Sequence, residues 1–206
     1  VSYGVDLDVQ CTLRNSFVYC TRTLATGVNH RSAFAKTENN VFNGWLTGIA
    51  AASSQSGIVC QNNLITKCTN GFSATSTVKG FWYNNISVGN TTNWPTQPTS
   101  LEGASNNAGL TGEAWMTTGG SRITIATTDF AGYSGNDFRP ASASSPQVEA
   151  GVTPYGYPAD DVGDRFRPDY MNGGAAVLDV GPFEYDHGYG PWPTSDYYGL
   201  EFTGLV

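Results

Sequence analysis

The sequence predicts an all-β protein, a parallel β-helix (solenoid) of about five rungs with an irregular C-terminal cap. Three observations predict this fold: an asparagine step that recurs on a near-constant period, a glycine landmark in each repeat, and a composition that is poor in charge. Charged residues make up 13% of the 206, whereas Gly occurs 25 times. Amphipathic surface helices draw on Glu, Lys and Arg, so this composition favours strands joined by many turns.

The asparagine step gives the clearest repeat. Positions 15, 40, 63, 85 and 107 lie 25, 23, 22 and 22 residues apart, and from the second copy onward each is the second member of an Asn-Asn pair. A period of roughly 20 to 50 residues indicates stacked structural repeats. Amides stacked at a tight bend can bond one another where water is excluded. We therefore expect an internal ladder made of Asn15, Asn40, Asn63, Asn85 and Asn107.

The second landmark is a glycine followed by an apolar residue, as in Gly27-Val28, Gly48-Ile49 and Gly71-Phe72. Short apolar-alternating runs lie between the landmarks and are bounded by turn-forming residues, which is typical of strands. Three short strands and three turns in about 22 residues fit a parallel β-helix better than a leucine-rich repeat, whose pattern demands several Leu per unit.

The rungs are expected to occupy residues 1–110. Within this stretch, residues 1–13 alternate apolar and polar side chains, which predicts an extended segment with one face in a core. A first rung without a cap would present unpaired backbone groups and an apolar cross-section. We therefore expect an upstream segment, a partner chain or a natural processing site at this end.

Residues 111–186 are expected to complete the same domain. The period breaks at 111–136, where we expect an irregular region containing a strand at Ser121–Thr127, and 137–186 should form the cap. Residues 187–206 are interpreted as a linker or tail leading to another domain or partner. This tail is rich in Gly, Pro and aromatic residues, and it ends in an apolar strand that an assembly partner or further polypeptide would continue.

The overall charge and the cysteines exclude several classes of protein. A formal net charge of −7 argues against nucleic acid as a partner, and no apolar run approaches the roughly 20 residues needed to span a bilayer. The four cysteines fit no CxxC spacing. Cys20 and Cys68 should lie two rungs apart, too distant for a disulfide, so we expect small thiols that fill the core.

Four motifs in residues 137–186 resemble a recurrent C-terminal ending. They are Asp137-Phe138-Arg139-Pro140, Ser145 to Gly151, Asp161 to Arg167 and Leu178 to Tyr185. They are similar to the close of right-handed parallel β-helix proteins, the pectate-lyase-like superfamily of secreted, cell-surface and phage-borne polypeptides that includes polysaccharide lyases. Glu149, Pro182 and Pro140 depart from the residues usual in that pattern. The resemblance implies a right-handed coil and an extracellular, cell-surface or virion location.

The cap offers two interpretations of its charged residues. Arginine forks could clamp carboxylates and tie irregular loops across the open end of the coil; the residues are Arg139, Arg165, Arg167, Asp161, Asp164, Asp179 and Glu184. Clustered carboxylates also suit calcium, and its candidate ligands are Asp160, Asp161, Asp164 and Asp179. Because arginines are interleaved, we favour ion pairs and expect no other cofactor.

An enzyme of this class would need paired carboxylates for hydrolysis, or a base with charge neutralisation for elimination. Asp6 and Asp8 share a strand face and could form such a pair. His30 or Lys36, together with Arg31, could serve a lyase. A solvated strand face explains the two aspartates more simply, so catalysis is the alternative hypothesis.

The aromatic residues favour glycan binding instead. In Phe81-Trp82-Tyr83, strand alternation places Phe81 and Tyr83 on one face and Trp82 on the other, while Trp94 lies in a loop. An outward ring could stack on sugars, and core packing is the competing explanation. We take Trp82, Trp94 and Tyr83 as glycan-binding candidates on a structural or adhesion protein, expected to be a trimer or part of a larger assembly. The alternative is a polysaccharide lyase or glycoside hydrolase.

Overall fold

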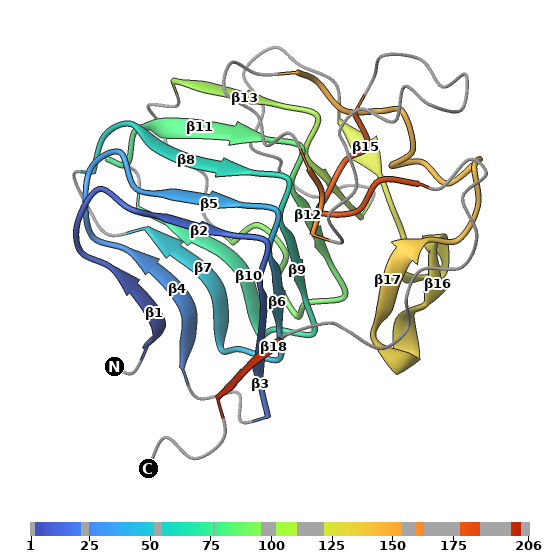
Figure 1. Cartoon of the computed structure of the whole chain (residues 1–206), viewed down its shortest axis with the longest axis horizontal. Helices are drawn as coiled ribbons and strands as arrows, with labels where there is room; N and C mark the ends of the chain where they lie inside the picture. The colour runs from blue at the N-terminus through green and yellow to red at the C-terminus, as the bar shows by residue number, and fades with distance from the viewer. Residues whose placement is uncertain are drawn as a thin grey trace.

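The structure is a computed structural model of the chain, and it confirms the predicted fold class. It describes residues 3–21, 25–51, 55–75, 77–95, 102–110, 122–153, 160–162 and 178–185, and the backbone of 199–202. Three sheets of parallel strands stack into a β-solenoid of about four turns (Figure 1). No described helix is long and apolar enough to cross a membrane.

Each of the first four turns contributes one strand to each of the three sheets. The first sheet has the order β1 (Tyr3–Leu7), β4 (Thr26–His30), β7 (Thr47–Ala51) and β10 (Asn70–Ala74). The second sheet has the order β2 (Thr12–Arg14), β5 (Lys36–Glu38), β8 (Ile58–Gln61), β11 (Gly80–Tyr83) and β13 (Gly103–Ser105). Residues 1–13, expected to be one extended segment, thus contain β1, a bend and the start of β2.

The third sheet is the longest. It has the order β18 (Gly199–Phe202), β3 (Phe17–Cys20), β6 (Val41–Asn43), β9 (Leu64–Thr66), β12 (Ile86–Val88), β14 (Ala108–Gly109) and β15 (Ile123–Thr124). The strand expected over Ser121–Thr127 is therefore only two residues long. A β-hairpin follows, and it consists of the short 3-10 helices η1 (Thr127–Asp129) and η2 (Tyr133–Gly135) with strands β16 (Phe130–Gly132) and β17 (Asp137–Pro140).

The glycine landmark has a packing reason. Gly27, Gly48 and Gly71 belong to β4, β7 and β10, and in each case an added Cβ would collide with neighbouring atoms. At Gly48 the collision is with Ile65 and at Gly71 with Ser87, both of the third sheet, whereas at Gly27 it is with the backbone oxygen of Gly48 on the next strand. The glycine column therefore lets the first sheet approach the inward side chains of the third sheet more closely than any larger residue would allow.

Two hydrophobic cores lie on opposite sides of the third sheet. Inside the solenoid, one core contains Val18, Phe42 and Ile65 from its inward face. Outside, a second core buries Phe17, Val41, Leu64, Ile86, Ala108 and Ile123, which face Phe130, Phe138, Val162, Val180 and Phe183 of the cap. Strands buried on both faces carry consecutive apolar residues, as Val41-Phe42 and Leu64-Ile65 do.

The position of the cap corrects one expectation. The described cap residues pack along the outer flank of the third sheet rather than across the open end of the coil. Every turn adds an outward apolar side chain to this flank, so the cap buries a continuous apolar surface there.

The C-terminal strand also has a definite place. β18 pairs in parallel with β3, with Leu200 opposite Val18 and Phe202 opposite Cys20. The first turn is thus extended by a strand of the same chain on one of its three sides. In the described part of the chain no further strand pairs with the outer edge of β1 or β2.

Candidate functional site

The asparagine ladder is present, with one change of register. Asn40 Nδ2 donates to Asn63 Oδ1 at 3.1 Å, Asn63 Nδ2 to Asn85 Oδ1 at 3.0 Å, and Asn85 Nδ2 to Asn107 Oδ1 at 3.0 Å. All four side chains are buried. The first position of the ladder is occupied by Ser16, whose backbone N donates to Asn40 Oδ1 at 3.1 Å. The assignment of Asn15 to the ladder was therefore wrong.

Asn15 belongs to a second asparagine column, one residue earlier in each turn. Its members have left-handed backbone angles, with φ between 52° and 56°; they are Asn15, Asn39, Asn62, Asn84 and Asn106. Asparagine tolerates this conformation because its short amide can bond locally. One doublet therefore combines two functions, since its first residue turns the chain and its second builds the ladder.

The left-handed column also binds the cap. Asn84 Nδ2 donates to Val152 O at 2.7 Å, and Val152 N donates to Asn84 Oδ1 at 2.9 Å. Asn106 Nδ2 donates to Ala150 O at 2.6 Å, and Asn39 Nδ2 donates to Asp160 O. These bonds hold residues 150–153 beside the outer face of the second sheet.

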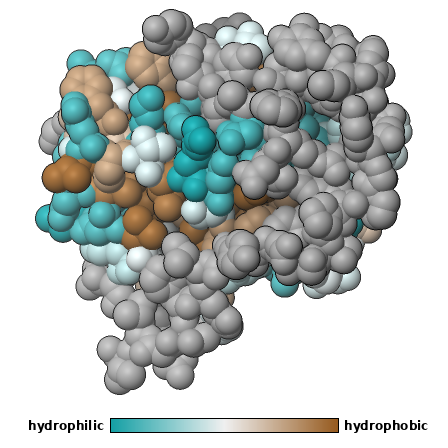
Figure 2. All heavy atoms as spheres, in the orientation of Figure 1, coloured by the Kyte–Doolittle hydropathy of each residue, from teal (hydrophilic) through white to brown (hydrophobic). Residues whose placement is uncertain are grey.

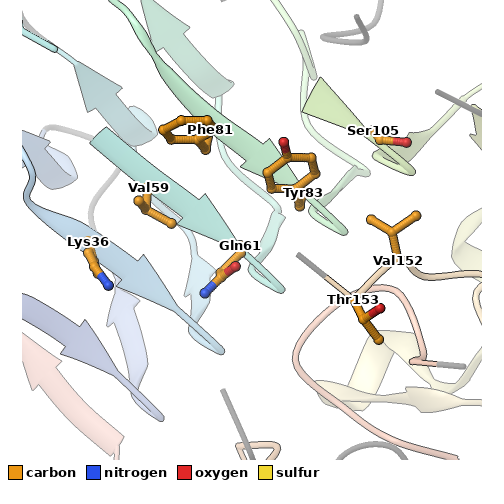
Figure 3. A pocket seen from close by; sticks show the side chains of 8 residues that line it. All are labelled: Lys36, Val59, Gln61, Phe81, Tyr83, Ser105, Val152 and Thr153. Atoms are coloured by element: carbon orange, nitrogen blue, oxygen red, sulfur yellow. The ribbon is translucent and has the colours of Figure 1, made fainter. Parts of the chain in front are cut away.

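A groove lies between this cap segment and the second sheet. Its volume is about 490 Å³. Figure 3 shows side chains from β5, β8, β11 and β13 on one side and cap residues on the other; the lining residues are Lys36, Val59, Gln61, Phe81, Tyr83, Ser105, Val152 and Thr153. Hydrophobic and hydrophilic residues lie side by side on the part of this face that is coloured in Figure 2.

Two aromatic rings form one part of the groove. Phe81 and Tyr83 lie two residues apart on β11, with ring centroids 6.4 Å apart and ring planes inclined by 19°. Gly103 on the neighbouring strand provides the space for both, because a Cβ there would collide with the Tyr83 hydroxyl and lie 3.3 Å from Phe81 Cδ1. The sheet backbone therefore supports both rings, and 36% of Phe81 is exposed.

The other part of the groove is polar but compensated in charge. Of the eight described lining residues, only Lys36 carries a formal charge, and its Nζ lies 4.0 Å from Oε1 of the buried Glu38. Gln61 Nε2 donates to the same Oε1 at 2.9 Å. At the edge, Arg14 and Asp160 approach to 3.7 Å. The groove therefore has little net charge in a chain whose overall charge is −7.

The glycan-binding candidates are divided by the structure. Tyr83 lies in the groove. Trp82 is fully buried in the solenoid core, with its ring edge-on to Phe72 at 5.4 Å. Trp94 is 7% exposed and stacks on Phe72 at 4.7 Å. Both tryptophans are buried because they pack on Phe72 and complete the core at the last turns. Neither presents a ring face to the surface, so the assignment of both as glycan-binding residues was wrong.

The catalytic candidates do not form one site. Arg31 lies 3.0 Å from Asp6 Oδ2 and 3.2 Å from Asp8 Oδ1. The hydrogen bond that Arg31 donates to Asp6, together with attraction to Asp8, raises the pKa of the arginine. The two aspartates thus form an exposed ion-pair cluster rather than an acid and base facing a groove.

His30 and Lys36 lie on opposite sides of the solenoid wall. His30 is completely buried, its Nε2 lies 3.2 Å from Thr37 Oγ1, and burial lowers its pKa to about 3. A neutral imidazole sealed in the core cannot reach a polysaccharide, so His30 is excluded as a base. Lys36 lies in the groove, although the sequence suggested it only as a catalyst.

In the described part of the cap, charged residues make an ion pair and several hydrogen bonds with backbone. Arg139 forms an ion pair with Asp137 at 2.5 Å and lowers the pKa of that carboxyl. Asp179 accepts hydrogen bonds from Glu149 N and Tyr185 N. Asp161 accepts one from Glu184 N at 2.9 Å, and Glu184 accepts one from Asp179 N at 3.2 Å. Such bonds tie the described loops of the cap to one another.

The remaining cap candidates, Arg165, Arg167 and Asp164, lie outside the described residues. Within the described part, no group of three or more His, Cys, Asp or Glu side chains is arranged to hold a metal ion. Asp160, one of the calcium candidates, is the residue that approaches Arg14.

The cysteines are thiols. All four are unbridged; Cys60 and Cys68 are buried, and Cys11 and Cys20 are half-buried. Burial raises the pKa of Cys60 and of Cys68 to about 12, so both stay protonated at neutral pH. They fill space in the core, as expected.

Comparisons with protein-family models, with curated proteins and with solved structures give no match. Sequence reasoning placed Phe81 and Tyr83 on one face of a strand and Trp82 on the other, but it did not establish which face is outward, and it missed the groove. Gln61 and Gly103 are found only from the strand register, in which Gln61 lies opposite Tyr83 and Gly103 lies opposite Phe81. Val152 gave none, because its place depends on Asn84, 68 residues away.

Proposed function

We propose that this protein is a structural or adhesion component of an extracellular or virion surface and that it binds glycan in the groove on its second sheet. The observation that carries the proposal is the pair Phe81 and Tyr83, supported by a rigid sheet and flanked by polar side chains. Binding sites on rigid scaffolds combine apolar surface with a few placed polar groups in this way.

Sugars suit both parts of the groove. The C–H face of a pyranose packs on an aromatic ring, which contributes apolar burial without requiring charge. The amide of Gln61 and the hydroxyls of Tyr83 and Ser105 are near enough to the rings, along the same strand ends, to bond sugar hydroxyls. Since the wall at Val152 is held by two hydrogen bonds to Asn84, little ordering is needed on binding.

The proposal includes assembly into a trimer or larger appendage. A solenoid is a stiff, extended element suited to that use, and the resemblance of the cap motifs to secreted and phage-borne proteins favours it. Light scattering across a concentration series tests this part. A mass that stays that of one chain at the highest concentration would contradict it.

The glycan part is tested by affinity electrophoresis against neutral xylan, mannan and β-glucan and against anionic polygalacturonate and alginate. We expect at least one polysaccharide to retard the protein, with Tyr83→Ala and Phe81→Ala each weakening binding about tenfold. Leu46→Ala is the matched control, because Leu46 is an exposed apolar residue outside the groove. No retardation by any polysaccharide, or equal retardation of the Tyr83→Ala protein, would refute glycan binding at this site.

The second candidate is a polysaccharide-degrading enzyme, favoured by one observation. The Glu38 carboxylate is buried behind the groove beside Lys36 and Gln61, and a shielded acid is a common catalytic feature. Release of reducing ends or unsaturated products from the same polysaccharides, abolished by Glu38→Gln, would identify the enzyme. Binding without product release would leave the adhesion proposal.

A further inference from the structure

Phe34 is an exposed aromatic residue in an unusual conformation. It lies between β4 and β5, has φ of 60°, and is 56% exposed. A bulky side chain in the left-handed region is a steric outlier that costs roughly 1–2 kcal/mol per residue. Strain of this kind is often retained at binding sites because it places a side chain where function needs it.

The ring of Phe34 is also supported from below. A Cβ added at Gly57 would collide with Cδ1 and Cε1 of the ring, so the aromatic ring occupies the space that a larger residue at 57 would fill. Gly57 itself has φ of 68°, which suits glycine. Phe34 N donates to Ser56 O at 3.1 Å, which ties the two turns together. The ring is thus supported by a neighbouring turn while much of it remains accessible.

The register places this ring beyond one end of the groove. Phe34 is two residues before Lys36, and Lys36, Val59 and Phe81 are neighbours on successive strands. Because neighbouring strands lie about 4.8 Å apart, the backbones of Lys36 and Phe81 are roughly 10 Å apart, and Phe34 lies in the turn that precedes Lys36. This distance is more than one sugar ring can cover. A ligand that touches both aromatics must therefore be an extended chain.

The charge of this surface distinguishes between classes of chain. The positive charge of Lys36 lies beside Glu38, and Arg14 approaches Asp160, so the groove holds no uncompensated cation among its described residues. A protein whose net charge is −7 would also repel an anionic polymer. Both facts favour an uncharged ligand.

We propose that the groove and Phe34 together bind the interior of an extended neutral polysaccharide, with Phe34 as a remote stacking subsite. The inference rests on the glycan-binding function proposed above. It adds the length of the ligand, its charge and a residue that sequence reasoning did not single out.

The test uses neutral oligosaccharides, from disaccharide to octasaccharide, prepared from whichever neutral polysaccharide retards the protein. We expect affinity to rise with length, and Phe34→Gly to weaken octasaccharide binding about tenfold while leaving the disaccharide unchanged. Glycine adopts the left-handed conformation without strain, so the variant should keep the thermal stability of the parent. Tyr83→Ala should weaken binding at every length, and Leu46→Ala at none.

Several results would overturn the inference. Octasaccharide binding unaffected by Phe34→Gly, or a disaccharide bound as tightly as the octasaccharide, would remove the remote subsite while the groove stands. Binding confined to the anionic polymers, or weakened strongly by salt, would contradict the neutral ligand. If the unaltered protein binds no glycan at all, the proposed function is refuted as well.

Discussion

At the scale of single residues, neighbouring asparagines have unlike environments. Asn63 Nδ2 donates to Thr37 O and to Asn85 Oδ1, and its own Oδ1 accepts from Asn40. The side-chain atoms of Asn62 are buried and have no hydrogen-bond partner in the described structure, and its backbone φ is 55°. Asn63 therefore contributes through its side-chain hydrogen bonds, whereas Asn62 contributes by adopting the left-handed backbone conformation.

This difference predicts a large loss of stability on substitution of Asn63 and a small change on substitution of Asn62. Asn63→Ala should lower the free energy of unfolding by roughly 3 kcal/mol, because it leaves buried donors and an acceptor unpaired. Asn62→Gly should change it by less than about 1 kcal/mol, since glycine keeps the left-handed turn and adds only unfolded-state entropy. Urea unfolding of both variants measures the difference. Equal losses would contradict the assignment of two columns.

His30 predicts a pH dependence of stability. Its folded pKa of about 3 lies below its ordinary 6.5, so the unfolded chain binds a proton that the folded chain excludes. The free energy of unfolding should therefore fall as pH drops from about 6.5 towards 3, by a few kcal/mol. Its neighbours Thr37 Oγ1 and Cys60 Sγ are uncharged and offer no compensation.

The His30→Gln variant isolates this contribution. It removes the titrating group, so its unfolding free energy should decline less steeply than that of the parent between pH 6.5 and 3. Chemical unfolding at several pH values gives the difference between the two proteins, in which the effects of carboxylates common to both cancel. Parallel curves would show that His30 does not control this part of the acid response.

At the scale of the elements, the spacing between sheets depends on glycines, which have no side chain. β7 approaches the third sheet where Gly48 faces Ile65. We predict that Gly48→Ala lowers the free energy of unfolding by about 1–3 kcal/mol, because the methyl group must displace a branched side chain or the strand. Gly135→Ala is the control, since a Cβ there meets nothing within 4 Å. Thermal unfolding that ranks Gly135→Ala as the worse variant would contradict the packing role.

At the scale of the whole molecule, the C-terminal strand β18 pairs with β3 of the first turn. β18 extends the third sheet beyond β3 (Figure 1), so it covers an edge that could otherwise pair with another chain. Deletion of residues 199–206 should lower the unfolding midpoint and raise the mass measured by light scattering above that of the full-length protein at the same concentration. Deletion of 203–206 alone is the control. Identical behaviour of both truncated proteins and the full chain would show that β18 has no protective role.

Much of the architecture follows from local sequence. The period, the three strands per turn, the glycine landmark and the buried asparagines are visible because each turn repeats its neighbour. In a solenoid each turn contacts mainly the turns beside it, so spacing along the chain becomes position in space. Strand alternation alone places Phe81 and Tyr83 on one face and Trp82 on the other, and the structure shows that Trp82 is the inward residue.

Other features required the tertiary structure. The register of Asn15 was misjudged because a single asparagine fits either column, and only its pairing with Asn39 distinguishes them. Trp94 is buried because Phe72, on an earlier turn, completes a stack with it.

The cap and the groove show the same limit most clearly. By itself the sequence determined a β-solenoid with an asparagine ladder, since those features repeat every 22 to 25 residues. Only the tertiary structure decided that the cap covers the flank of the third sheet and that Val152 forms a wall opposite Tyr83. These placements depend on contacts such as Asn84 with Val152, 68 residues apart, and a single sequence carries no periodic signal for contacts that occur once.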